Sequence, residues 1–179
     1  AVLVARRAPG GSRRFARVTG VALAAVILAV VAAGILHITV WNPLAKVPGM
    51  TLDEIYSTLR SANELPPPVF LTVWALSGAV SAVGVLVLAF APTRRLRAAA
   101  STRRVAGVAL AGIAGTALSV WVAGFSMGMG IADTFMTSGA DAAGTGTLLV
   151  FIGVAAGIPA VLLALVPGPV AGRVENAQP

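Results

Sequence analysis

His37 is the first candidate for chemistry in this 179-residue chain, because it lies near the end of a long apolar stretch. A histidine there can titrate near neutral pH, bind a metal or ligate a haem iron. Bis-histidine haem ligation needs a second histidine, and the sequence has only one. A lone histidine at the end of a membrane helix more often hydrogen-bonds to a neighbouring helix or to lipid headgroups. We therefore expect a structural role for His37 and no bound cofactor.

Three hydroxyl residues fall on one side of the third apolar stretch, namely Thr116, Ser119 and Ser126. Hydrogen-bond donors and acceptors of this kind line the pores of channels and transporters. The same hydroxyls can also bond back to their own helix and allow close packing. No charged residue stands beside them, which favours packing. If several copies of this helix surrounded a polar path, His37 and Asp133 would lie at its outer mouth.

Residues for catalysis or metal binding are sparse. The sequence has no cysteine, so it has no thiolate nucleophile, no disulfide and no cysteine-based metal site. It contains no H-E-x-x-H and no phosphate-binding G-x-x-x-x-G-K-[ST] motif, and its one G-x-S-x-G match, at residues 124–128, falls inside an apolar stretch. Asp133 and Asp141 could offer oxygen ligands to a cation, but two carboxylates without EF-hand spacing favour a solvated loop. We therefore expect no catalytic site, no metal and no enzymatic activity.

Small residues at four-residue spacing are the clearest packing signal. Helices in lipid associate through close backbone approach, which glycine, alanine and serine permit. Within the predicted spans the pattern occurs twice as G-x-x-x-G and once as a longer run: Gly124 with Gly128, Gly153 with Gly157, and Gly107, Ala111, Gly115 and Ser119 in series. Such faces can pack the helices of one subunit or join several copies of the chain. The first interpretation is favoured in a sequence so rich in alanine and glycine.

Four stretches are long enough to carry these residues across a bilayer. The chain is 58% hydrophobic and 11% charged, with a mean hydropathy of +0.92, whereas a globular domain averages about 25% charged residues. We predict spans over residues 18–40, 69–91, 105–130 and 147–166. The first would reach about 35 Å as a helix, enough for a hydrocarbon core of about 30 Å. The fold class is therefore an all-α membrane protein with a four-helix transmembrane domain over residues 18–166.

A short amphipathic helix is predicted over residues 51–64, between the first two spans. Ile55 and Leu59 belong to one apolar stripe, with polar residues on the opposite face. Thr51 and Glu54 match the capping box, in which each side chain satisfies a backbone N–H at the other position. We expect this helix to lie on the outer membrane surface or to cover the bundle.

The distribution of basic residues predicts the orientation. Eleven of the 13 basic residues lie in the N-terminal tail (residues 1–17), the middle loop (93–104) and the C-terminal tail (167–179), leaving only Lys46 and Arg60 elsewhere. Cytoplasmic loops carry this excess of lysine and arginine. We predict that both termini are cytoplasmic in a bacterial plasma membrane, with anionic lipid headgroups near the arginine clusters. Because the clusters adjoin apolar spans, the net charge of +7 does not indicate a nucleic-acid partner.

Two functions remain open. Abundant small-residue faces and little polar chemistry favour a non-enzymatic protein that acts through helix–helix association. It would be an accessory subunit of a membrane complex or a self-associating unit, so its expected partner is a membrane protein or another copy of the chain. The alternative is an oligomeric channel or transporter for an ion or small solute, lined by the hydroxyls of the third helix.

Overall fold

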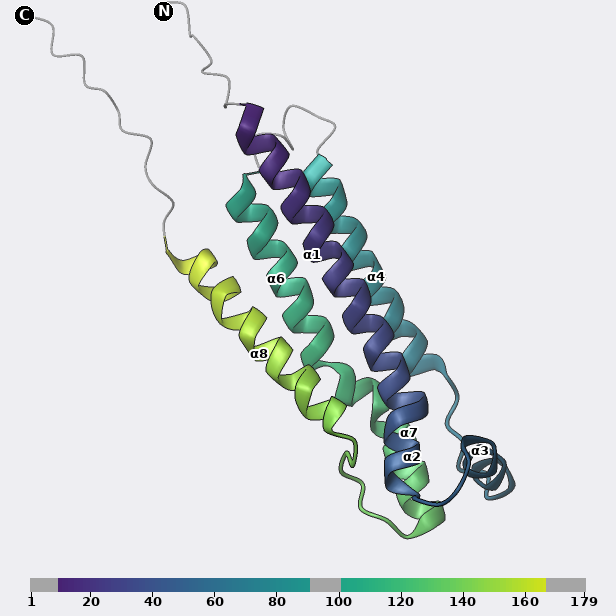
Figure 1. The fold of residues 1–179 in the computed structure, drawn as a ribbon. Helices are drawn as coiled ribbons and strands as arrows, with labels where there is room; N and C mark the ends of the chain where they lie inside the picture. Colours follow the sequence, from purple (N-terminus) through teal and green to yellow (C-terminus); the bar gives the residue numbers. More distant parts are fainter. Residues whose placement is uncertain (1–9, 91–100, 167–179) are drawn as a thin grey trace, which may run out of the picture.

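The computed structural model of the chain describes residues 10–90 and 101–166. Within these ranges the regular structure is entirely helical. Four helical segments are long and apolar enough to cross a membrane, and they run side by side (Figure 1). The chain is therefore a multi-pass membrane protein, as its hydropathy predicts.

The first segment is continuous and contains one widened turn. It consists of α1 (Gly10–Leu36), the π-helical η1 (His37–Trp41) and α2 (Asn42–Lys46). The helix thus continues past Val40, where the sequence predicts the end of the span. Pro43 lies in the first turn of α2 and offers no N–H to the preceding turn, where the Thr39 carbonyl accepts the Tyr56 hydroxyl. The Asn42 N–H bonds to the carbonyl of His37, five residues back, and such π-helical turns occur frequently at functional sites.

The third segment is broken, whereas the second and fourth are single helices. These segments are α4 (Val69–Phe90), then α6 (Thr102–Leu118) with α7 (Val120–Phe135), then α8 (Gly144–Leu165). Ser119 separates α6 from α7 with a ψ of 0°. Its hydroxyl donates to the Gly115 carbonyl at 2.6 Å. A hydropathy pattern cannot reveal such a break, because one serine leaves the apolar run intact.

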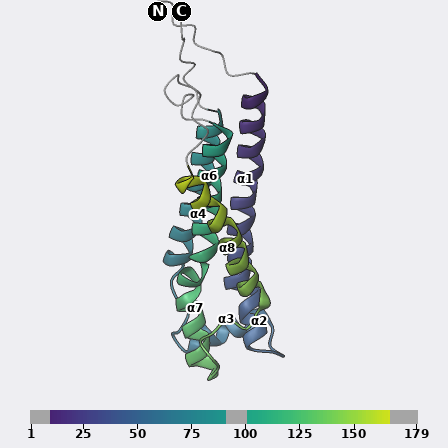
Figure 2. The same ribbon diagram turned by 90° about the vertical axis from the view of Figure 1, so that its left-hand side faces the viewer.

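The long helices form an open bundle. α1, α4 and α6 pack against one another, while α8 packs on α6 and hardly touches α1 (Figures 1 and 2). Small residues allow the close approach of α1 and α4. A Cβ added to Gly20 would overlap Ala89, and one added to Gly78 would overlap Val31. The close packing of α1 against α4 therefore depends on the absence of a side chain at Gly20 and Gly78.

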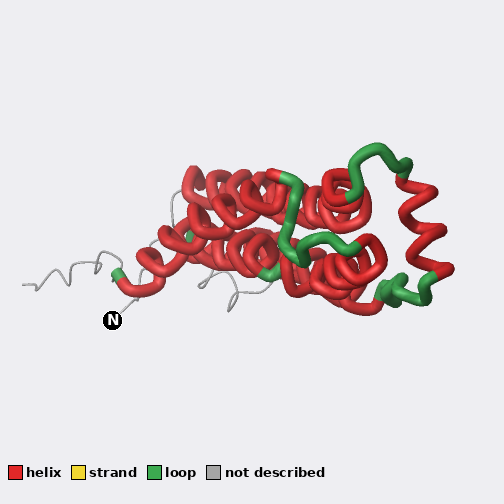
Figure 3. Tube along the Cα trace, turned by 90° about the horizontal axis from the view of Figure 1, so that it is seen from below, coloured by secondary structure: helices red, strands yellow, loops and turns green. Residues whose placement is uncertain are grey.

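α3 (Leu52–Ser61) lies across one end of the bundle, called here the α3 end (Figures 1 and 3). The Thr51 N–H and hydroxyl donate to Glu54 Oε2 at 2.7 and 2.8 Å. In return the Glu54 N–H donates to Thr51 Oγ1 at 3.3 Å, which completes a capping box. Ile55 and Leu59 are fully buried in a small second core that includes residues of α7. α3 is thus attached to the bundle by its own apolar contacts.

Candidate functional site

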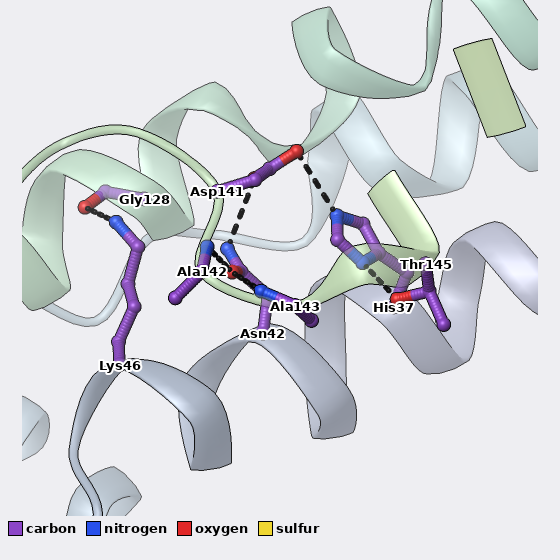
Figure 4. Close-up of polar contacts among 8 residues, drawn as sticks. All are labelled: His37, Asn42, Lys46, Gly128, Asp141, Ala142, Ala143 and Thr145. Atoms are coloured by element: carbon purple, nitrogen blue, oxygen red, sulfur yellow. Dashed lines mark hydrogen bonds and ion pairs between the residues drawn. The ribbon is translucent and has the colours of Figure 1, made fainter. Parts of the chain in front are cut away.

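Polar side chains from distant parts of the sequence meet at the α3 end (Figure 4). They come from η1, from α2, from the connection between α7 and α8, and from the first turn of α8. We call this group the polar cluster, and its members are His37, Asn42, Lys46, Asp141 and Thr145.

His37 is almost completely buried and has a partner at each ring nitrogen. Its Nε2 lies 3.3 Å from Asp141 Oδ2, and its Nδ1 lies 2.8 Å from Thr145 Oγ1. An ionised carboxylate can only accept hydrogen bonds. The neutral tautomer that satisfies both contacts therefore donates from Nε2 to Asp141 and accepts the Thr145 hydroxyl at Nδ1. His37 thus connects the first helical segment to the start of α8.

Asn42 holds the chain that leads into α8. Its Nδ2 donates to Asp141 Oδ1 at 3.1 Å, and its Oδ1 accepts the N–H groups of Ala142 and Ala143 at 2.8 and 3.3 Å. Ala143 occupies the N-cap position of α8 but offers no side-chain cap. The amide of Asn42 therefore satisfies backbone groups that the start of this helix leaves without intrahelical partners. Because Asp141 accepts from both His37 and Asn42, the three side chains form one network.

Lys46 extends this attachment to α7. The side chain is buried, with only 7% of the residue exposed. Its ammonium donates to the Ser138 carbonyl at 2.8 Å and to the Gly128 carbonyl at 3.3 Å. The predicted first span ends at residue 40, but the helix continues through η1 and α2 and turns Lys46 inward. A buried ammonium needs carbonyl partners of this kind, since an unpaired one would be very costly.

The series Thr145, His37 and Asp141 has the connectivity of a hydroxyl nucleophile with a general base. The packing leaves little space for such chemistry. A Cβ added to Gly146 would overlap Asp141 Oδ2 and would lie 3.0 Å from His37 Cε1. The backbone of α8 therefore fills the space beside the imidazole. Among the described residues, no three His, Asp or Glu side chains gather as metal ligands do. The arrangement is suited to joining the α1–α2 segment to the α7–α8 connection.

The other residues predicted for a polar path lie apart from the polar cluster. Thr116 is buried against α4, and Ser119 Oγ accepts the Trp74 Nε1–H at 3.2 Å. Ser126 lines a surface cavity near α3, and Asp133 is exposed on α7. The three hydroxyls thus have different surroundings within one chain, and only His37 belongs to the polar cluster.

The two predicted G-x-x-x-G pairs pack inside the subunit. Gly124 and Gly128 face η1 and the chain that follows α7. Gly153 and Gly157 face α6, and a Cβ on Gly153 would overlap Leu118. These four glycines therefore bring helices of the same chain together.

Sequence reasoning missed Asn42, Lys46 and Thr145 as members of the polar cluster. Asn42 and Asp141 are separated by 99 positions, so no local pattern connects them. A weak signal exists in the polar Asn42 and Lys46, which stand four residues apart at the end of an apolar run. Comparisons of the chain with protein-family models, with curated proteins and with solved structures give no match.

Proposed function

We propose that this chain is a non-enzymatic membrane protein that acts through helix–helix association. It would serve as an accessory subunit of a membrane complex or associate with copies of itself. One observation carries the proposal: a small-residue face of α6 is largely uncovered in the described part of the chain. We call it the α6 face, and it consists of Gly107, Ala111 and Gly115.

The α6 face is open at Ala111 and Gly115 and only partly covered at Gly107. A Cβ added to Gly115 would meet no atom of another described helix within 4 Å. One added to Gly107 would have only Leu163 nearby, at 3.8 Å, and Ala111 between them is exposed. α8 borders this face at Gly107, whereas Ala111 and Gly115 are exposed. The glycines of the G-x-x-x-G pairs, in contrast, are used within the subunit.

The chemistry of this face suits a second helix. In lipid, helices gain from van der Waals contact rather than from the hydrophobic effect, so they associate where small residues let backbones approach. The spacing of Gly107, Ala111 and Gly115 places them on one stripe of the helix. A partner helix laid along this stripe would make contacts that disordered lipid tails make less well.

We further propose that both termini are cytoplasmic in the plasma membrane and that the α3 end faces outward. The support is the concentration of arginine in residues 1–17 and 93–104. The chain has no cysteine, so a single Ala62→Cys variant at the α3 end can report orientation. A membrane-impermeant maleimide should label it in intact cells. Labelling only after the cells are opened would reverse the orientation.

Photocrosslinking from the α6 face tests the association. Val108 borders this face and is 50% exposed, so a benzophenone on Val108→Cys should capture another membrane-protein chain in native membranes. Val80→Cys on α4 is a matched control, because Val80 is also an exposed valine within a span. We expect a discrete crosslinked protein band from position 108 and none of comparable yield from position 80. Lipid adducts alone at position 108 would contradict the proposal.

The channel alternative has weaker support. Ser119 already accepts a bond from Trp74, and Thr116 is buried against α4. Neither residue belongs to the α6 face, so association through that face would not gather these hydroxyls around an axis. Flux of an ion or small solute into liposomes containing the protein, reduced by Thr116→Val, would favour the alternative.

A further inference from the structure

A groove on the side of the bundle lies near the α3 end, apart from both the polar cluster and the α6 face. It consists of two adjoining cavities of about 350 and 450 Å³, which share Phe70 and Ser126 as lining residues. The first cavity lies between α3, η1, α4 and α7, and the second continues along α7. We call the pair the lateral groove. Each cavity falls within the range of about 300–1,000 Å³ that is usual for small-molecule sites.

Aromatic side chains form the apolar wall of the lateral groove. Phe70 of α4 is 59% exposed, and Trp121 and Phe125 of α7 are 61% and 58% exposed. All three belong to segments that are long and apolar enough to span the membrane. The groove is therefore open toward the hydrocarbon of the bilayer, and an apolar occupant can enter it sideways.

A basic side chain lies at the end of the lateral groove that is nearest to α3. Arg60 lines the first cavity, and within the described residues its guanidinium forms no ion pair. Tyr56 lines the same cavity, but its hydroxyl already donates to the Thr39 carbonyl at 2.9 Å. Burial raises the pKa of Tyr56, so the phenol stays neutral. Arg60 therefore gives this end of the groove an unpaired positive charge.

A free hydroxyl marks the junction of the two cavities. The hydroxyls of two other serines, Ser77 and Ser81 of α4, are already used, since each donates to a carbonyl of its own helix, at 2.7 and 2.9 Å. Ser126 lines both cavities and, within the part of the chain that the structure describes, makes no hydrogen bond. Its hydroxyl is thus available to an acceptor in the groove.

We propose that the lateral groove binds an acyl chain of an anionic phospholipid from the adjacent leaflet, with the lipid phosphate at Arg60. The aromatic wall takes the hydrocarbon, and the guanidinium pairs with the phosphate, for which its planar donors are suited. Ser126 donates to an ester oxygen between these two ends. This site lies at the opposite end of the bundle from Arg13, Arg14 and Arg17, which stand at the start of α1.

Fluorine NMR of the full chain labelled with 5-fluorotryptophan reads this site directly. The sequence has three tryptophans, of which Trp121 lines the groove while Trp41 and Trp74 do not. We expect phosphatidylglycerol to shift the Trp121 signal saturably in mild detergent and phosphatidylcholine to have a much weaker effect. Arg60→Gln should weaken the apparent affinity at least fivefold. Arg14→Gln, an exposed arginine on α1, should leave it unchanged.

Several results would overturn the proposal. The Trp121 signal could respond equally to the two phospholipids, or Arg60→Gln could bind phosphatidylglycerol with unchanged affinity. The Trp41 signal could also shift in parallel with that of Trp121, without saturation. A response to sodium oleate but not to phosphatidylglycerol would also contradict it, because the site would then select free fatty acids. If Arg60→Gln disturbed the fold, seen as a shifted signal of the buried Trp74, Ser126→Phe would serve instead. Filling the junction should abolish the saturable response, and a persistent response would refute the site.

Discussion

Asp141 is the residue on which the polar cluster depends most. One of its carboxylate oxygens lies 3.3 Å from His37 Nε2, and the other accepts the Asn42 amide at 3.1 Å. Both neighbours approach with a donor group, and the carboxylate offers an acceptor oxygen to each.

Replacing this carboxylate should therefore weaken the fold. In Asp141→Ala, the side chain would offer no acceptor to Asn42 Nδ2 or His37 Nε2, and these two buried residues would each lose a partner. We expect a loss of about 1–3 kcal/mol in the free energy of unfolding, measured by SDS titration of the purified protein. Asp133→Ala is the control, because Asp133 is exposed and forms no ion pair within the described residues. Equal effects of the two substitutions would contradict the assigned network.

A second prediction concerns the backbone of α8 beside the polar cluster. Gly146→Ala should destabilise the protein, because the new methyl group would overlap Asp141 and crowd His37. Overpacking of this kind typically costs about 1–3 kcal/mol. Gly144→Ala lies two residues earlier, and a Cβ there would meet nothing within 4 Å in the described chain. Thermal unfolding followed by circular dichroism should separate the two variants, and a stable Gly146→Ala protein would show that the cluster is loosely packed.

Sequence reasoning found His37 but could not find its partners. The histidine is conspicuous as the only one in the sequence, and the structure places it beside Asp141 and Thr145. Thr145 is 108 positions away, and its pairing depends on how α8 folds back beside the first segment. The residue pattern of one helix does not show which distant helix will pack beside it.

At the scale of elements, length and hydropathy predict the four spans because each apolar run exceeds what a bilayer needs. Helix ends and breaks depend on finer details. The first segment continues to Lys46 because a π-helical turn accommodates the chain before Pro43 and because carbonyls satisfy the buried ammonium. The break at Ser119 follows from one residue leaving helical geometry. Neither feature changes the average apolarity of the run.

α3 provides a pH-dependent prediction. The Thr51 N–H and hydroxyl hold the pKa of Glu54 below its usual value. A carboxyl group with a lowered pKa in the folded state stabilises that state above its unfolded pKa, and this contribution disappears as the pH falls through the lowered value. We expect the amides of the first turn of α3 to exchange faster at pH 3 than at pH 7, after correction for intrinsic rates.

Glu54→Gln is the control for this effect. Glutamine can complete a capping box but does not titrate, so the corrected exchange of α3 should change little with pH. Asp53→Asn removes a carboxylate from the same turn that makes no capping bond, and it should keep the wild-type dependence. If Glu54→Gln and the wild-type protein responded alike to acid, the capping box would not be the cause.

At the scale of the whole molecule, the arrangement is asymmetric. Three long helices pack together, while α8 is supported mainly by α6 (Figure 2). The glycines of the two G-x-x-x-G pairs pack against other parts of the same chain, but the α6 face remains largely uncovered in the described residues. Sequence alone could not distinguish these faces, since spacing shows that small residues share a stripe and not which helix already covers it.

The state of the protein in native membranes tests the central claim of association most directly. We would extract the chain at native expression into polymer nanodiscs, without detergent, and determine the protein mass of the particles. The proposed association predicts particles heavier than one chain, and Gly115→Ile should return the chain to a single copy because its side chain fills the α6 face. Ala29→Ile, at an exposed alanine of α1, should retain the assembly. A wild-type particle with the mass of one chain and no other protein would contradict the account.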